Sequence, residues 1–315
     1  MKEADRVANL SGLSICVLGG DRREVELVSG LIDSGARVSC FGTPTDGLRS
    51  EAAVAPSARD ACSGANAVIL PLSGTDTSGN VKITCKSVSI TRELLAAADP
   101  AAIVLSGVVR PCLAADCAAL GIRLVDTGED DELAILNSIP SAEGAIFMAM
   151  QATPFTIHNS NCLVLGPGRT GLTLAGMLQG LGAHVWGAAR KASGRARLFE
   201  MGIAPVDFAD LPHCLPQMDI VFNTVPSPVL DRSLVYVLKR TAVIIDLASA
   251  PGGVDFVAAA ERGIHAELAP GLPGKVAPLT AGRILARVIP RIIEDEFRKG
   301  EREIQPLNQE HGPGR

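Results

Sequence analysis

A strand-length apolar run, a glycine-rich loop and a helix-like run follow one another between residues 161 and 178, and this succession constrains the fold more than any other feature. The apolar run is NCLVL at 161–165, and the apolar residues of 172–178 continue as a helix. The loop between them, GPGRTG at 166–171, has the spacing GxGxxG. Its glycines allow a tight turn, a close approach of the backbone to a phosphate and close helix–strand packing. This context predicts a Rossmann unit rather than an ordinary strand–helix turn.

Short apolar runs alternate with helix-period segments along the whole chain, which is typical of an α/β protein with parallel sheets. A chain of 315 residues suits two cores rather than one. We therefore predict an α/β fold with two doubly wound parallel-sheet domains, the C-terminal one a Rossmann domain. The expected strands are 13–18, 37–41, 67–70, 101–105 and 122–125 in the first half, and 162–165, 184–187, 219–223, 242–246 and 265–267 in the second.

The domain boundaries are expected at the joins between these two series. The connecting segment 131–152 is expected to form two helical pieces broken at Pro140. We expect an N-terminal α/β domain of flavodoxin-like or substrate-binding type over 1–140 and a Rossmann domain over 141–280. A helix over 281–298 is a candidate to pack back on the N-terminal domain, and a flexible tail is expected over 299–315.

Composition limits which kinds of partner and which cellular compartment we expect for this protein. Aromatic residues make up 3% of the chain and the net charge is −5, which argues against nucleic acid or an anionic membrane as the main partner. No apolar run reaches the roughly 18 residues of a membrane span, and the N-terminus lacks the pattern of a signal peptide. The eight cysteines form no CxxC pair and the five histidines show no metal-ligand spacing. We expect a reduced, cytoplasmic protein without a metal site.

The end of the second strand in the Rossmann half indicates which dinucleotide binds. NAD-dependent enzymes place Asp or Glu there, about 20 residues after the loop, to hold the ribose hydroxyls. Here the strand 184–187 runs through two alanines into Arg190 and Lys191, whose cations suit the 2′-phosphate of NADP. The alternative is a solvated helix start that carries two charges. We predict NADP as the cofactor.

Further contacts with the dinucleotide are expected in the loop itself and at the ends of later strands. Arg169 is placed to stack on the adenine or to add positive charge, and the loop after 219–223 is placed to contact the nicotinamide ribose. The alternative is that the later loops are ordinary connecting loops without a binding role. The expected cofactor-binding residues are Gly166, Gly168, Arg169, Thr170, Gly171, Arg190, Lys191, Asn223, Thr224, Val225, Pro226, Ala248 and Ser249.

Six longer strings resemble one family. They are VLGGDRR at 17–23, LPLSG at 70–74, NSIPSAEG at 137–144, LGPGRTG at 165–171, DLASAPGG at 246–253 and APGLPGKVAP at 269–278. In this order, and over about 13–287, the sequence resembles the A subunit of dipicolinate synthase from spore-forming bacteria. It departs from that pattern in its Ala-rich N-terminal half and over 76–86.

The resemblance implies an activity, a partner and a location. The activity is the NADP-dependent oxidation of 4-hydroxy-tetrahydrodipicolinate, or of its dehydrated form, to dipicolinate (pyridine-2,6-dicarboxylate). The implied partner is the flavoprotein-like B subunit of dipicolinate synthase, and the implied location is the cytoplasm of the sporulating mother cell. The resemblance carries over no set of catalytic residues.

A dicarboxylate substrate calls for cations, hydroxyls or amides on loops at strand ends. The expected substrate-binding residues are Arg22, Ser73, Ser106, Asn137 and Ser138. The catalytic residues are unknown from the sequence. Lys275 and Glu143 are the candidates. The alternatives are that Lys275 is an exposed loop lysine and that Glu143 is a carboxylate on a helix face.

Two other functions stay open at this point. One is an NADP-binding scaffold whose partner performs the chemistry, and the other is a stand-alone NADP dehydrogenase of another hydroxy acid. The chain lacks the arrangement of histidine, carboxylate and arginine that D-2-hydroxy acid dehydrogenases use. Whether the chain forms a homo-oligomer is also left open.

Overall fold

The computed structural model describes residues 8–83 and 87–304, with side chains as far as residue 300. The chain divides into two compact units. The first contains the residues up to Leu133 together with those from Pro278 onward, and the second is Ala134–Ala277. The divisions therefore fall at 133/134 and 277/278, where the sequence placed them at 140/141 and 280/281. The second unit is an insertion within the first.

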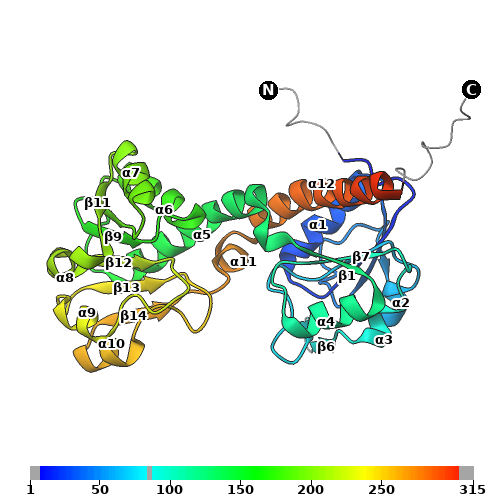
Figure 1. The fold of residues 1–315 in the computed structure, drawn as a ribbon, viewed down its shortest axis with the longest axis horizontal. Coiled ribbons are helices and arrows are strands. Elements are labelled where there is room, and N and C mark those ends of the chain that lie inside the picture. The colour runs from blue at the N-terminus through cyan, green and yellow to red at the C-terminus, as the bar shows by residue number, and fades with distance from the viewer. Residues whose placement is uncertain (1–7, 84–86, 305–315) are drawn as a thin grey trace, which may run out of the picture. The chain divides into compact units, whose positions relative to one another are not determined.

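The first unit is built on a six-stranded parallel sheet (Figure 1). Its strand order is β3-β2-β1-β4-β7-β8. The chain first adds strands on one side of β1 and then on the other, so the strand order reverses between β1 and β4. The strands are β1 (Ser14–Leu18), β2 (Arg37–Phe41), β3 (Ala53–Val54), β4 (Ala67–Ile69), β7 (Ile103–Ser106) and β8 (Arg123–Asp126). The helices are α1 (Arg22–Asp33), α2 (Ala58–Cys62), α3 (Arg92–Leu95), α4 (Pro111–Leu120) and the short η1 (Thr127–Glu129).

A two-stranded antiparallel hairpin, β5 (Asn80–Lys82) and β6 (Ser87–Ser89), lies outside this sheet. It stands in the chain between β4 and α3. The sequence did not predict it, nor the two-residue edge strand β3. Strands this short carry too few alternations to show a period of two.

The second unit repeats the architecture of the first. Its sheet is also six-stranded and parallel, in the order β11-β10-β9-β12-β13-β14, with the reversal between β9 and β12. The strands are β9 (Asn161–Leu165), β10 (His184–Ala188), β11 (Ala204–Val206), β12 (Ile220–Asn223), β13 (Val243–Asp246) and β14 (His265–Leu268). The helices are α5 (Asp131–Ala152), α6 (Arg169–Gly180), α7 (Ala192–Glu200), α8 (Leu211–Cys214), α9 (Arg232–Val237), α10 (Phe256–Arg262) and α11 (Leu272–Val276), with η2 (Phe208–Asp210) and η3 (Leu215–Gln217).

The central strands are buried on both faces because helices cover each sheet on both sides. Residues 162–165 of β9 and all of β12 are buried, and side chains from alternate positions of these strands contribute to two separate apolar clusters. Such strands read as continuous apolar runs, which is why they were visible in the sequence. The prediction of two doubly wound parallel-sheet domains is confirmed.

Helix α5 is continuous through Pro140, so the predicted break was wrong. A proline inside a helix removes one hydrogen bond and costs about 3 kcal/mol. Here Ala142, Ala145 and Ala149 are fully buried in the core of the second unit, and this packing outweighs the loss. α5 is also long and apolar enough to cross a membrane by length and composition, with 44% of its most apolar window buried. The sequence had been expected to hold no such segment. A buried core helix passes the same test, so this is weak evidence for a membrane span.

Helix α12 spans Pro278–Ile304, longer than the predicted 281–298. Residues 299–304 are therefore helical rather than a tail, while 305–315 lie outside the described residues. α12 packs along α1 (Figure 1). The two helices approach closely at Gly30, where an added Cβ would stand 2.6 Å from the Cβ of Ala286.

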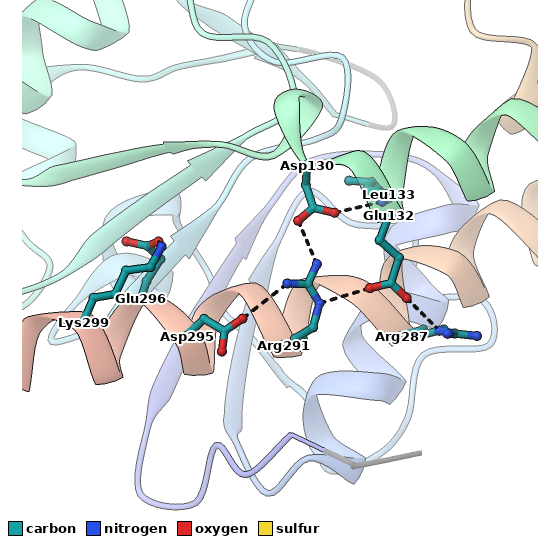
Figure 2. Close-up of polar contacts among 8 residues, drawn as sticks. All are labelled: Asp130, Glu132, Leu133, Arg287, Arg291, Asp295, Glu296 and Lys299. Carbon is teal, nitrogen blue, oxygen red and sulfur yellow. Dashed lines mark hydrogen bonds and ion pairs between the residues drawn. The ribbon is translucent and has the colours of Figure 1, made fainter. Parts of the chain in front are cut away.

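A network of ion pairs joins α12 to Asp130 and to the first turn of α5 (Figure 2). The Arg291 guanidinium donates to Asp130 at 2.7 Å, to Glu132 at 3.1 Å and to Asp295 at 3.3 Å. Arg287 also donates to Glu132, at 3.1 Å. Burial would raise the pKa of Asp130, but the Leu133 N–H and Arg291 outweigh it and lower that pKa. All these residues belong to the first unit, so the network joins the two chain segments that make up this unit.

The described cysteines are all free, and most are buried as the sequence indicated. Cys85 lies outside the described residues. Within residues 8–83 and 87–304, no group of three or more His, Cys, Asp or Glu side chains could hold a metal ion.

Candidate functional site

The loop after β9 is shaped by its two outer glycines. Gly166 has φ +95°, and a Cβ there would lie 2.7 Å from Val225 Cγ2 and 2.8 Å from Thr224 Oγ1. At Gly171 a Cβ would stand 1.9 Å from the carbonyl oxygen of Gly166. Thr224 fixes the turn by donating its hydroxyl to the carbonyls of Leu165 and Gly166, at 2.8 and 3.1 Å. The structure thus assigns Thr224 a hydrogen-bonding role within the loop.

The N-terminus of α6 is open at this loop. Its N-cap is Gly168, which provides no side-chain cap, and an added Cβ there would meet nothing within 4 Å. The backbone N–H groups of the first helical turn therefore have no side-chain acceptor at the cap. Such an end, with its partial positive charge, is suited to a phosphate group.

The matching position in the first unit is closed. Helix α1 also follows the first strand of its sheet, but its N-cap is Asp21, whose carboxylate accepts from the N–H of Arg23. The Glu24 carboxylate accepts from the N–H of Asp21, which completes a capping box. Two carboxylates occupy the end of α1, so only the second unit presents an open helix N-terminus after its first strand.

The end of β10 carries exposed positive charge. Arg190 is exposed, and its guanidinium lies 5.2 Å from the ring centroid of Phe208. Arg195, which was not selected from the sequence, donates to the carbonyls of Ala189 and Arg190 at 2.9 and 2.8 Å. It also pairs with Asp207 at 2.6 Å. Arg195 thus holds the backbone that presents Arg190, and its place in α7, five residues after Arg190, was the available signal.

The loops after β12 and β13 are joined by two buried polar side chains. Asn223 and Asp246 are both 0% exposed, and the Asn223 amide donates to the Asp246 carboxylate at 2.9 Å. Asn223 also bonds the backbone of Val225, while Asp246 accepts from the N–H groups of Ala248 and Gly253. These residues position the two loops. Asp246 was not among the predicted site residues, although its place at a strand end could have identified it.

This burial changes what two of the predicted cofactor contacts can do. Asn223 has both side-chain polar atoms engaged with protein, and Ala248 is 4% exposed with its N–H bound to Asp246. Both act as supports of the loops in this structure. Pro226 and Ser249 are exposed at the same strand ends.

The residues predicted on α5 and α11 lie on packed elements. The Ser138 hydroxyl is buried and bonds Thr173 of α6 at 2.7 Å and the Ile135 carbonyl at 2.6 Å, while Asn137 is half-buried beside it. A Cβ at Gly144 would lie 3.0 Å from Leu272 and 3.1 Å from Val276, so α5 contacts α11. Glu143 and Lys275, next to these contact positions in the chain, are exposed.

In the first unit, two of the predicted substrate residues line one pocket. Arg22 and Ser73 border a pocket of about 270 Å³ that is also lined by Arg23 and Lys82. Ser106 does not line it, and its buried hydroxyl donates to the Val108 carbonyl at 2.9 Å. Lys82 was not selected from the sequence.

Fold and loop together define the class: this is a two-unit protein of the dehydrogenase fold, with a GxGxxG loop in its second unit. The structure of D-lactate dehydrogenase from Escherichia coli shares that fold, with a TM-score of 0.64 at 15% identity, and the match covers 91% of this chain and 98% of that one.

Closer relatives give the family. The model of the N-terminal domain of the dipicolinate synthase A subunit matches residues 14–127. The dipicolinate synthase A subunit of Bacillus subtilis (strain 168) is 37% identical over 294 residues, which make up 91% of this chain and 97% of that protein. The crystal structure of the dipicolinate synthase A subunit from Bacillus halodurans has a TM-score of 0.85 at 38% identity, covering 90% of this chain and 99% of that one. The chain belongs to the family of dipicolinate synthase A subunits, as the sequence strings predicted.

Proposed function

We propose that this protein is an NADP-dependent oxidoreductase subunit that forms dipicolinate from 4-hydroxy-tetrahydrodipicolinate or from its dehydrated form. Family membership supports the product, and the dehydrogenase fold supports the type of reaction. The observation that carries the proposal is the uncapped N-terminus of α6 beside Gly166–Gly171, in a sheet whose second strand is followed by Arg190 and Lys191. The first unit, with carboxylates at the equivalent helix end, offers no comparable site.

NADP is favoured over NAD by charge at the end of β10. No carboxylate follows Ala188 directly, and Arg190 and Lys191 are both exposed. Asp207 is nearby but is paired with Arg195, which leaves the charge of Arg190 available to a 2′-phosphate. A guanidinium binds phosphate through charge-assisted hydrogen bonds.

The reaction requires the substrate to lose water, and then one hydride and one proton, before the ring becomes an aromatic pyridine. Bound NADP⁺ supplies the hydride acceptor. The protein's own task is to hold the two carboxylates and to keep the ring in attack geometry, which can supply several kcal/mol of the barrier. Arg22 and Ser73, which line one pocket of the first unit, are proposed to bind the substrate. Glu143 and Lys275 are the groups to test as proton acceptor.

Partner and location are proposed from the same family. The flavoprotein-like B subunit of dipicolinate synthase is the proposed partner, and the mother cell cytoplasm of a sporulating bacterium is the proposed site of action. The −5 net charge fits a small-molecule enzyme and not a nucleic-acid-binding protein.

The cofactor assignment is tested by titrating the full chain with NADP and with NAD, for wild type and Arg190→Asp. We expect the substitution to weaken NADP binding by roughly ten-fold or more and to change NAD binding much less, because a charge-assisted contact to phosphate is replaced by repulsion. Phe199→Ala, an exposed side chain on the same unit, is the control and is expected to leave both affinities unchanged. Equal losses of both dinucleotides in Arg190→Asp would contradict the role of the 2′-phosphate.

The reaction is tested by supplying the purified chain with NADP⁺ and freshly prepared substrate. Formation of the pyridine product by the chain alone supports the proposal. Product only with a partner protein would indicate a cofactor-binding scaffold, and turnover of an unrelated hydroxy acid instead would indicate a different dehydrogenase.

A further inference from the structure

A small cationic pocket in the first unit lies where an open α/β sheet binds its ligands. Its lining comes from the segments that follow β1, β2 and β4, and from β5. β1 and β4 are neighbours at the reversal point of the strand order. Ligands of such sheets bind outside the carboxyl ends of the strands at this point. The pocket of about 270 Å³ therefore occupies the position that the dinucleotide loop occupies in the second unit.

The hairpin β5–β6 reshapes this position for something smaller than a dinucleotide. A Cβ at Gly19 would lie 2.6 Å from Val81 Cγ1, and a Cβ at Gly42 would lie 2.3 Å from Ile83 Cγ2. The Lys82 carbonyl accepts the N–H of Gly20 at 3.2 Å. Residues 81–83 thus cover the turn after β1 and use a backbone donor that would otherwise face a ligand.

The pocket keeps a surplus of positive charge. Arg22, Arg23 and Lys82 line it together with a single carboxylate, Asp21. Arg23 binds Asp21 through two hydrogen bonds of 2.9 Å, so these two charges neutralise each other. Burial would raise the pKa of Asp21, but its bonds with Arg23 outweigh burial and lower that pKa, which keeps the pair ionised.

Two cations remain for a ligand. Arg22 contacts Asp46 at 3.3 Å, but the side chains are 62% and 90% exposed, and such surface pairs are weak and easily exchanged. Lys82 makes no salt bridge with any described residue. Ser73 adds a hydroxyl to the same lining. Two available cations and a hydroxyl in a small pocket suit a carboxylate group.

We propose that Lys82, carried by the β5–β6 hairpin, binds a carboxylate of the substrate together with Arg22 and Ser73. This rests on the proposed function, since the dicarboxylate is its product. It adds a substrate-binding residue that was not selected from the sequence. The hairpin thereby turns the first unit from a dinucleotide-type site into a carboxylate site.

The test measures the binding of pyridine-2,6-dicarboxylate to the full chain with NADP present, by calorimetry in metal-free buffer. Lys82→Gln is expected to weaken this binding by roughly ten-fold or more, because it removes a charge-assisted contact. Lys82→Arg is expected to retain most of the affinity. Lys299→Gln, which makes the same charge change on α12, is expected to bind like wild type. In turnover assays Lys82→Gln should raise KM far more than it lowers kcat.

The outcomes separate this inference from the proposed function. If wild type forms and binds the dicarboxylate and Lys82→Gln binds it equally well, the role of Lys82 is refuted and the proposed function stands. If wild type neither forms nor binds it, both fail. If Lys82→Gln loses NADP as well as the dicarboxylate, a specific carboxylate contact is also refuted, because the side chain then supports the structure as a whole.

Discussion

The buried carboxyl of Glu24 makes the stability of the first unit depend on pH in an unusual direction. The side chain is 1% exposed; its Oε2 accepts the Asp21 N–H at 2.6 Å, and its Oε1 has no partner among the described residues. Burial raises the pKa of Glu24 to about 7 from the ordinary 4.5. Because the folded-state pKa lies above the unfolded one, this group's stabilising contribution is complete below pH 4.5 and is lost as pH rises through about 7.

The magnitude follows from the shift. Each pKa unit corresponds to about 1.4 kcal/mol, so the ionisation of Glu24 costs about 3 kcal/mol of unfolding free energy at alkaline pH. Glu24→Gln removes the ionisation and keeps an oxygen that can accept the Asp21 N–H, since Gln serves in a capping box as Glu does. Relative to wild type, the variant should therefore gain about 3 kcal/mol between about pH 4 and about pH 8.

The assay is urea denaturation of the full chain at a series of pH values, with wild type and variant compared at each pH. The comparison cancels the titrating groups that do not interact with residue 24; the neighbours Asp21 and Arg23 do interact with it. Glu26→Gln, at a half-buried position on the same helix, is the control for the substitution itself. A difference between wild type and Glu24→Gln that does not change with pH would refute the reasoning, because it would mean that the buried carboxylate is compensated when ionised.

Three further substitutions test the glycine-rich loop, the contact between α1 and α12, and the ion pairs of Arg291. Gly171→Ala should reduce NADP binding by roughly ten-fold or more, because its Cβ collides with the Gly166 carbonyl, whereas Gly176→Ala, whose Cβ meets nothing closer than 4.0 Å, should bind normally in the same titration. Gly30→Ala should lower the stability by about 1–3 kcal/mol in urea denaturation, since α1 and α12 must separate to admit the Cβ; an unchanged midpoint would contradict the close approach. Arg291→Met should cost about 1 kcal/mol, discounted for the partial exposure of its partners, and the loss should shrink at high salt. A loss independent of salt would assign the effect to lost packing instead.

The sequence predicted the fold well because the two sheets are parallel and covered on both faces. Strands such as β9 and β12 are continuous apolar runs with glycine turns or polar residues at their ends, and these features are local. The prediction from sequence was wrong where tertiary packing overrides the local conformational preference. Pro140 predicted the end of a helix, but the buried alanines that follow it hold α5 in one piece.

The candidate site was predictable to the extent that it is built from contiguous residues. The loop at 166–171 could be identified because its strand, turn and helix adjoin in the chain. The Asn223–Asp246 bond and the packing of residues 81–83 over Gly19 and Gly42 join segments far apart in sequence. Local patterns do not show which distant segments meet, so neither the bond between Asn223 and Asp246 nor the position of Lys82 at the pocket was predicted.

The insertion of one unit within the other sets an order for folding during synthesis. Residues 134–277 form a continuous unit and can complete their sheet as soon as they emerge from the ribosome. The first unit has all six strands of its sheet by residue 126, but the apolar face of α1 that packs on α12 stays uncovered until α12 has been made. Until then the nascent chain exposes that face, and we expect chaperone binding or aggregation to begin there when translation is truncated before residue 278.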